Sequence, residues 1–159
     1  MGFNAASFLE AQGLRITRPR ASMARILFAD GSDRHVTAEW LAEELDRQGQ
    51  PVALATVYNT LHSFVKSGAL REVRGASANT IVFDTNTADH HHFYDEATGE
   101  LTDIPASALS IEGLPGTPDG KMISGLDLII RLQPGQLHLL LDDRDDMVEL
   151  ADRQFLDII

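Results

Sequence analysis

The sequence contains three consecutive histidines, His90, His91 and His92, with two carboxylates within reach, Asp84 before them and Asp103 after them. Alternate side chains of a strand share a face, so His90 and His92 are predicted to point together while His91 points elsewhere. Imidazole and carboxylate groups are suitable ligands for iron, manganese or zinc. The residues alone leave two interpretations open: a metal or haem site, or a solvated histidine-rich turn. His35 is a further, isolated candidate ligand.

The chain of 159 residues contains no cysteine. This excludes disulfides, a four-cysteine structural zinc site, iron–sulfur clusters and cysteine nucleophiles. The sequence also lacks a G-x-S-x-G elbow and a phosphate-binding Walker loop. We therefore expect a protein that is not an enzyme, although a small metalloenzyme with a His/Asp site is the alternative from another functional class.

The net charge of −11 is unevenly distributed. Residues 1–84 hold nine basic and nine acidic residues, whereas residues 85–159 hold four basic and fifteen acidic ones. This asymmetry predicts two regions with separate roles, the first compatible with nucleic acid. Apolar runs are too short to cross a bilayer and the N-terminus does not resemble a secretory signal, so we expect no membrane contact and a cytoplasmic location.

Residues 1–84 are predicted to form short helices followed by a β-hairpin. Asn4 and Thr37 are typical helix caps, and Pro19 suits the first turn of a helix. In the fourth helix, within 53–68, a buried stripe is predicted at Val57, Leu61, Phe64 and Val65. Strands 70–74 and 80–84 complete a pattern typical of a winged helix-turn-helix, whose last helix enters the major groove. A small α+β domain without a DNA role is the alternative.

Residues 85–141 are predicted to form an α/β dimerisation and sensing domain. We expect strands at 93–95, 100–104 and 123–133, helical turns within 105–113, and a loop at 113–120. The last strand is expected to be buried, and its apolar residues on both faces predict a homodimer. Residues 142–159 have apolar residues at helical spacing and form a predicted acidic amphipathic helix or tail that docks.

Several segments together resemble the ferric uptake regulator family, in order over about residues 8–132. They are GLRITRPR (13–20), HVTAEWLAEEL (35–45), ATVYNTLHSFVKSGAL (55–70), FD (83–84), DHHH (89–92) and TGELTDI (98–104). The resemblance implies an α+β protein with an N-terminal winged helix-turn-helix DNA-binding domain and a C-terminal α/β dimerisation domain. It also implies a homodimeric transcription regulator that binds double-stranded DNA at an AT-rich inverted repeat.

Carried over by position, the family's regulatory metal site falls on five residues: His35, Asp84, His90, His92 and Asp103. Haem is a second possible ligand of the cluster His90, His91 and His92. For DNA, the resemblance places Tyr58 at the bases with Thr56 and Asn59 beside it, and Arg15 in the minor groove. We assign phosphate contacts to Arg18, Arg20 and Lys66.

Two departures from the family pattern narrow the choice of branch within the family. Asp95 and Thr98 stand where members with structural zinc carry C-x-x-C, and Ser110 and Ser124 interrupt a further family metal site. The histidine triplet followed by Phe-Tyr and the absence of cysteine resemble the iron response regulator branch of alphaproteobacteria. The alternative within the family is a manganese- or peroxide-sensing repressor with the same ligands.

Overall fold

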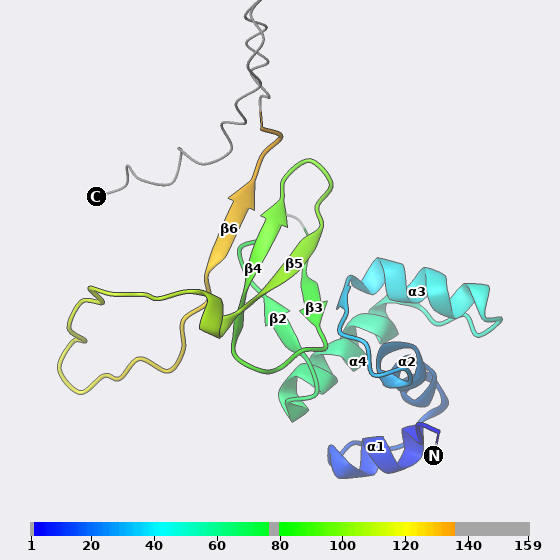
Figure 1. Ribbon diagram of the computed structural model, residues 1–159. Helices are drawn as coiled ribbons and strands as arrows, with labels where there is room; N and C mark the ends of the chain where they lie inside the picture. Colours follow the sequence, from blue (N-terminus) through cyan, green and yellow to red (C-terminus); the bar gives the residue numbers. More distant parts are fainter. Residues whose placement is uncertain (1, 77–79, 136–159) are drawn as a thin grey trace, which may run out of the picture.

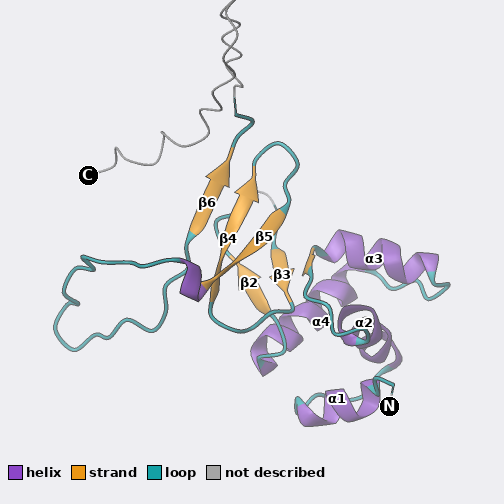
Figure 2. Ribbon diagram, in the orientation of Figure 1, coloured by secondary structure: helices purple, strands orange, loops and turns teal. Residues whose placement is uncertain are grey.

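The computed structural model describes residues 2–76 and 80–135 (Figure 1). The elements in chain order are α1 (Ala5–Ala11), α2 (Arg18–Phe28), β1 (His35–Val36), α3 (Ala38–Arg47), α4 (Leu54–Ser67), β2 (Arg71–Val73), β3 (Val82–Asp84), β4 (His90–Asp95), β5 (Leu101–Pro105), η1 (Ala106–Ala108) and β6 (Ile129–Leu132). Figure 2 shows α1 to α4 gathered at one end of the described chain and β4, β5 and β6 at the other, with β2 and β3 between them.

Side-chain caps define the starts of the first three helices. The Asn4 side chain accepts hydrogen bonds from two backbone N–H groups at the start of α1. Thr17 and Thr37 do the same for one N–H each in α2 and α3. These groups would otherwise lack a partner, so each cap stabilises its helix by about 1 kcal/mol. At the other end of α4, Gly68 adopts φ 81°, a left-handed conformation that glycine accommodates without strain.

A hydrophobic core joins the four helices and includes Phe83 of β3. From α4 it takes Val57, Leu61 and Phe64, which are fully buried as the sequence predicts, whereas Val65 is only partly buried. The opposite face of α4 is therefore left toward solvent.

The first sheet has the strand order β1-β3-β2, with both pairings antiparallel. The hairpin of β2 and β3 confirms the predicted wing, whereas β1 is an addition that the sequence pattern did not indicate. In this sheet His35 lies directly opposite Asp84. The register thus places a candidate ligand from the helical region beside one at the end of the wing.

The second sheet has the order β5-β4-β6, with β4 antiparallel to β5 and parallel to β6. Its register places His92 between Asp103 and Ile129. At the turn from β4 to β5, Asp95 accepts hydrogen bonds from the N–H groups of Ala97 and Thr98, so a carboxylate stabilises the turn there.

The prediction of a long, buried last strand over 123–133 is wrong. Only Ile129–Leu132 pair with β4, because the parallel register begins opposite His92 and β4 ends at Asp95. Within β6, Ile129 is partly buried and Leu132 is exposed. The helical segment expected within 105–113, of one turn or more, is the single turn η1.

The loop from η1 to β6 extends away from the rest of the described chain (Figure 1). The predicted helix or tail at 142–159 lies outside the described residues. Within residues 2–76 and 80–135, no helix has the length and apolarity required to cross a membrane.

Two arginines connect the wing to the second sheet. Arg71 of β2 forms an ion pair with Asp127 at 2.7 Å, and Arg131 of β6 donates to the backbone oxygens of Gly75 and Ala76 after β2. A small apolar cluster also joins the two sheets and the segment after β2: Val73, Ala76, Val82 and Leu101 are buried in it, and Tyr94 and Ile129 pack against it. These contacts set the angle at which the two sheets meet.

Candidate metal centre

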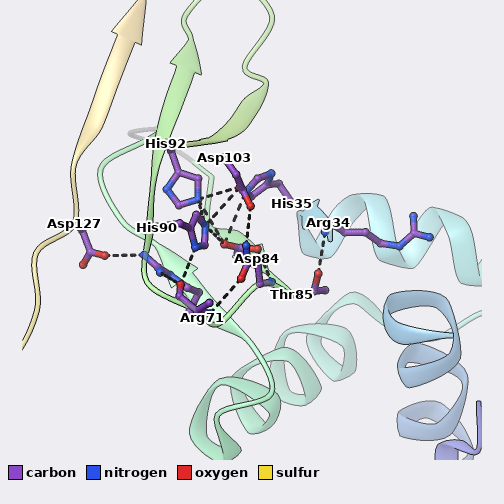
Figure 3. A network of polar contacts seen from close by, with 11 residues as sticks. Arg34, His35, Arg71, Asp84, Thr85, His90, His92, Asp103 and Asp127 are labelled. Carbon is purple, nitrogen blue, oxygen red and sulfur yellow. Dashed lines mark hydrogen bonds and ion pairs between the residues drawn. The ribbon is translucent and has the colours of Figure 1, made fainter. Parts of the chain in front are cut away.

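Five side chains from four strands converge where the two sheets meet (Figure 3). β1 supplies His35, β3 supplies Asp84, β4 supplies His90 and His92, and β5 supplies Asp103. One nitrogen or oxygen atom from each lies within 4.8 Å of all the others. The structure therefore brings together the whole predicted set of metal ligands. Each of these residues lies in a strand, so the pairing of the strands, and not a loop, positions its side chain.

The shortest contacts join imidazole nitrogens to carboxylate oxygens. Nε2 of His35 lies 2.9 Å from Oδ1 of Asp103, and Nε2 of His90 lies 3.0 Å from Oδ2 of Asp84. Nε2 of His92 lies 3.5 Å from Asp84 Oδ2 and 3.7 Å from Asp103 Oδ1. The Nε2 atoms of His90 and His92 are 3.0 Å apart, and two lone pairs at that distance repel unless a proton or a cation lies between them.

Without a bound ion, burial of these polar side chains would carry a desolvation penalty. Asp84 is fully buried, and His90 and His92 are 4% and 2% exposed. Although they are close to one another, His35 Nε2, Asp84 Oδ2 and Asp103 Oδ1 form no hydrogen bond, and all three atoms are buried without a hydrogen-bond partner among the described residues. Unpaired buried polar atoms carry a desolvation penalty of about 1–3 kcal/mol each, and more when charged. A divalent ion bound by these atoms would remove that penalty, so the donor set fits a metal.

A contact at His90 and burial at His92 favour the forms of these two rings that bind a metal. Nδ1 of His90 lies 2.8 Å from the backbone oxygen of Ala88, which can only accept, so Nδ1 carries the proton and Nε2 presents its lone pair. Burial lowers the pKa of His92, and the neighbouring His90 and His35 lower it further, against the opposing effect of the two aspartates. A neutral His92 ring is a competent ligand near neutral pH.

His91 points away from the cluster, as alternation along β4 predicts. It is 9% exposed, and its Nδ1 is buried without a partner among the described residues. The structure therefore does not bring His91 to the same point as His90 and His92.

Asn86, which the sequence analysis did not single out, contacts both aspartates of the site. Its backbone N–H donates to Asp84 and its side-chain amide donates to Asp103. The only signal in the sequence is its position in DTNTAD, a polar stretch of a type that favours side-chain-to-backbone turns.

The residues expected to contact DNA lie on two parts of the helical region. Thr56, Asn59 and Lys66 are exposed on α4, on the side away from the core. Tyr58 is partly buried, and its hydroxyl donates to Glu39 of α3 at 2.8 Å. Arg15 and Arg18 are exposed at the start of α2, where Arg20 donates to the backbone oxygen of Arg15.

The Tyr58–Glu39 hydrogen bond alters both acidities. It lowers the pKa of the Glu39 carboxyl and raises the pKa of the Tyr58 phenol. Tyr58 is thus a hydrogen-bonded side chain that ties α4 to α3, rather than a freely rotating one.

Comparison with known proteins identifies relatives of this chain. Residues 11–112 match the model of the ferric uptake regulator family. The peroxide-responsive repressor PerR of Staphylococcus aureus is 32% identical over 96 residues, which cover 60% of this chain and 63% of that protein. The match therefore spans less than two thirds of the relative's length.

Two solved structures share the fold. The ferric uptake regulator of Pseudomonas aeruginosa with manganese has a TM-score of 0.61 at 22% identity, covering 83% of this chain and 98% of that one. The Vibrio cholerae ferric uptake regulator has a TM-score of 0.63 at 21% identity, covering 82% and 100%. At these identities the likeness supports the fold, an α+β arrangement of helices followed by two small sheets. With a family model matched over residues 11–112, the chain belongs to the ferric uptake regulator family.

Proposed function

We propose that this protein is a DNA-binding transcription regulator that senses a divalent metal ion through His35, Asp84, His90, His92 and Asp103. The observation that carries the proposal is the set of buried, unpaired atoms on His35, Asp84 and Asp103 at the meeting point of the two sheets. Three imidazoles and two carboxylates form a donor set suited to iron, manganese or zinc. The bound ion would supply a positive charge that interacts with both carboxylates and with the lone pairs of the three imidazoles.

The arrangement couples the site to the proposed DNA-reading helix. His35 lies in β1, two residues before Thr37, which caps α3. Glu39 in the first turn of α3 accepts the hydrogen bond from Tyr58 of α4. When His35 is held against the second sheet, α3 is held with it, and α4 follows through this hydrogen bond and the shared core. A bound metal ion would then favour one orientation of α4. If DNA binds that conformer better, metal binding raises the affinity for DNA.

DNA recognition is assigned to the exposed side of α4 and the start of α2. Thr56, Tyr58 and Asn59 would read base edges, while Arg18, Arg20 and Lys66 would hold phosphates. Arg15 would enter the minor groove. A homodimer would present two copies of α4, so we expect an inverted repeat, rich in A and T, as the operator.

The burial of the histidines favours an ion over haem at this cluster. The exposed fractions of His90, His91 and His92 are 9% or less, which leaves no open face for a porphyrin in this conformation. Haem binding at these residues would require β4 to separate from its neighbours. Haem and the ion would therefore compete for His90 and His92.

Within the family, we propose the iron response regulator branch. The support is the His-His-His-Phe-Tyr sequence of β4 and the absence of cysteine. The alternative is a manganese- or peroxide-sensing repressor, since a relative is named a peroxide-responsive repressor. Metal analysis and a visible spectrum of protein purified from iron-replete cells would distinguish a bound iron ion, bound manganese and bound haem.

The proposed function is tested by DNA binding with and without Mn²⁺. Fluorescence anisotropy on a labelled AT-rich inverted repeat should give an affinity that changes about tenfold or more when Mn²⁺ is added, in the range typical of coupled sites. The His90→Ala/His92→Ala double variant should lose this response. His91→Ala is the matched control on the same strand and should keep it. Equal responses in the wild type and the double variant would refute the assigned site.

A further inference from the structure

The loop between β3 and β4 places one residue, Asn86, against both carboxylates of the candidate metal centre, through its backbone at one and its side chain at the other. The backbone N–H of Asn86 donates to Oδ1 of Asp84 at 2.8 Å, and its side-chain Nδ2 donates to Oδ2 of Asp103 at 2.9 Å. We propose that Asn86 is a positioning residue, which occupies one oxygen of each aspartate and directs the other toward the ion. This inference rests on the proposed metal-sensing function.

The oxygens that Asn86 leaves free are the ones that face the histidines. Asp84 Oδ2 lies 3.0 Å from His90 Nε2, and Asp103 Oδ1 lies 2.9 Å from His35 Nε2. Both oxygens are buried and lack a hydrogen-bond partner among the described residues. A hydrogen bond to the second oxygen of a carboxylate favours metal binding through the other oxygen. Asn86 would therefore favour one ligand oxygen from each aspartate, so that five side chains would offer five ligand atoms.

The orientation of the Asn86 amide follows from the chemistry of its partners. Its Oδ1 accepts a hydrogen bond from the Ala88 N–H at 3.1 Å, and a backbone N–H can only donate. The Asp103 carboxylate can only accept, so Nδ2 must face it. The two contacts require the same amide orientation, and they close a turn of the type that asparagine favours.

The same turn also directs a histidine ligand. The backbone oxygen of Ala88 accepts hydrogen bonds from Nδ1 of His90 at 2.8 Å and from Arg71 at 3.2 Å. The turn closed by Asn86 thus places the acceptor that selects the metal-binding tautomer of His90. Through one loop, Asn86 acts on three of the five ligands.

Asn86→Ser is the sharpest test. A serine hydroxyl can still accept from the Ala88 N–H, and the backbone N–H to Asp84 is unchanged, but the shorter side chain does not reach Asp103. The dissociation constant for Mn²⁺, measured by chelator competition on the full chain, should rise about tenfold or more. The visible ligand-field spectrum of bound Co²⁺ should change as well, because the released Asp103 carboxylate can bind through both oxygens. Asn86→Ala, which also removes the turn contact, should weaken Mn²⁺ binding at least as much.

Thr87→Ala is the matched control, since Thr87 is exposed in the same loop. It should leave both readouts unchanged. If Asn86→Ser and Asn86→Ala bind Mn²⁺ with wild-type affinity and an unaltered Co²⁺ spectrum, the positioning role is refuted, even if their thermal stability falls. That result would leave the proposed function standing, provided that wild type binds Mn²⁺ and the His90→Ala/His92→Ala variant does not. Failure of wild type itself to bind Mn²⁺ would overturn both proposals.

Discussion

Residues of the proposed metal centre combine burial with opposing charges, and His92 shows the consequence most clearly. It is nearly fully buried between two carboxylates and two imidazoles, and the net effect is a lowered pKa. Desolvation is the largest cause, so at this ring burial outweighs the attraction of Asp84 and Asp103 for a proton.

The lowered pKa of His92 predicts how stability depends on pH. In the unfolded chain this histidine takes up a proton as the pH falls through about 6.5, whereas the folded protein resists protonation. The unfolded state then binds more protons, so the free energy of unfolding of chelator-treated protein should fall as the pH falls below about 6.5. It should not depend on this group above that pH. His92→Gln should show a shallower decrease between pH 7 and 5, measured by urea denaturation at each pH. Equal slopes for the variant and the wild type would contradict this assignment.

The sequence was sufficient to predict which residues form the site, but not how most of them contact one another. Alternation along β4 is enough to predict that His90 and His92 share a face, because the period of a strand is fixed. By contrast, the contact of His35 with Asp103 depends on how two sheets meet, and only the family resemblance pointed to it. Asn86 could not be predicted as a contact of both aspartates, because its hydrogen bonds depend on the tertiary course of a loop.

Among the elements, α4 has the most direct link to the proposed function. Val57, Leu61 and Phe64 bury one face of α4 in the core, so the opposite face of the helix is the one directed toward solvent. Helix positions were predictable from caps and periodicity. The strands were less so, because β1 has only two residues and therefore no period, and the register of β6 is set by its partner β4.

Tyr58 on α4 gives a prediction at this scale. Tyr58→Ala should weaken operator binding by about 1–3 kcal/mol and reduce discrimination against altered operators. Lys66→Ala, on the same helix, should instead weaken binding to all sequences about equally and reduce the dependence of log affinity on log salt. Anisotropy titrations at several salt concentrations separate the two effects. Operator binding by Tyr58→Ala that matches wild type would mean that another element reads the bases.

The whole molecule has a helical region with balanced charge and a second region that carries exposed apolar residues. Large hydrophobic side chains are exposed along the segment from η1 to β6, at Ile111, Leu114, Met122, Ile123, Leu126 and Leu132. Met122 is 90% exposed. Apolar residues concentrated in one segment are typical of an interface, and the predicted dimer would use this segment together with β6.

Dimerisation through this segment can be tested directly. Sedimentation at micromolar concentration should show a dimer for wild type, and the Met122→Asp/Leu126→Asp variant should shift toward monomer because buried charges without partners oppose association. Leu54→Asp changes an exposed apolar residue of α4 and should remain dimeric. A wild-type monomer, or a dimer unaffected by the double substitution, would exclude this interface.

The central claim is that the five converging side chains bind one divalent ion, and calorimetric titration with Mn²⁺ tests it most directly. The account predicts one high-affinity Mn²⁺ per wild-type chain, retention of that binding in His91→Ala, and its loss in His90→Ala/His92→Ala. Retention of wild-type Mn²⁺ affinity in the double variant would contradict the account, because the ion would then bind equally well without two of the five proposed ligands.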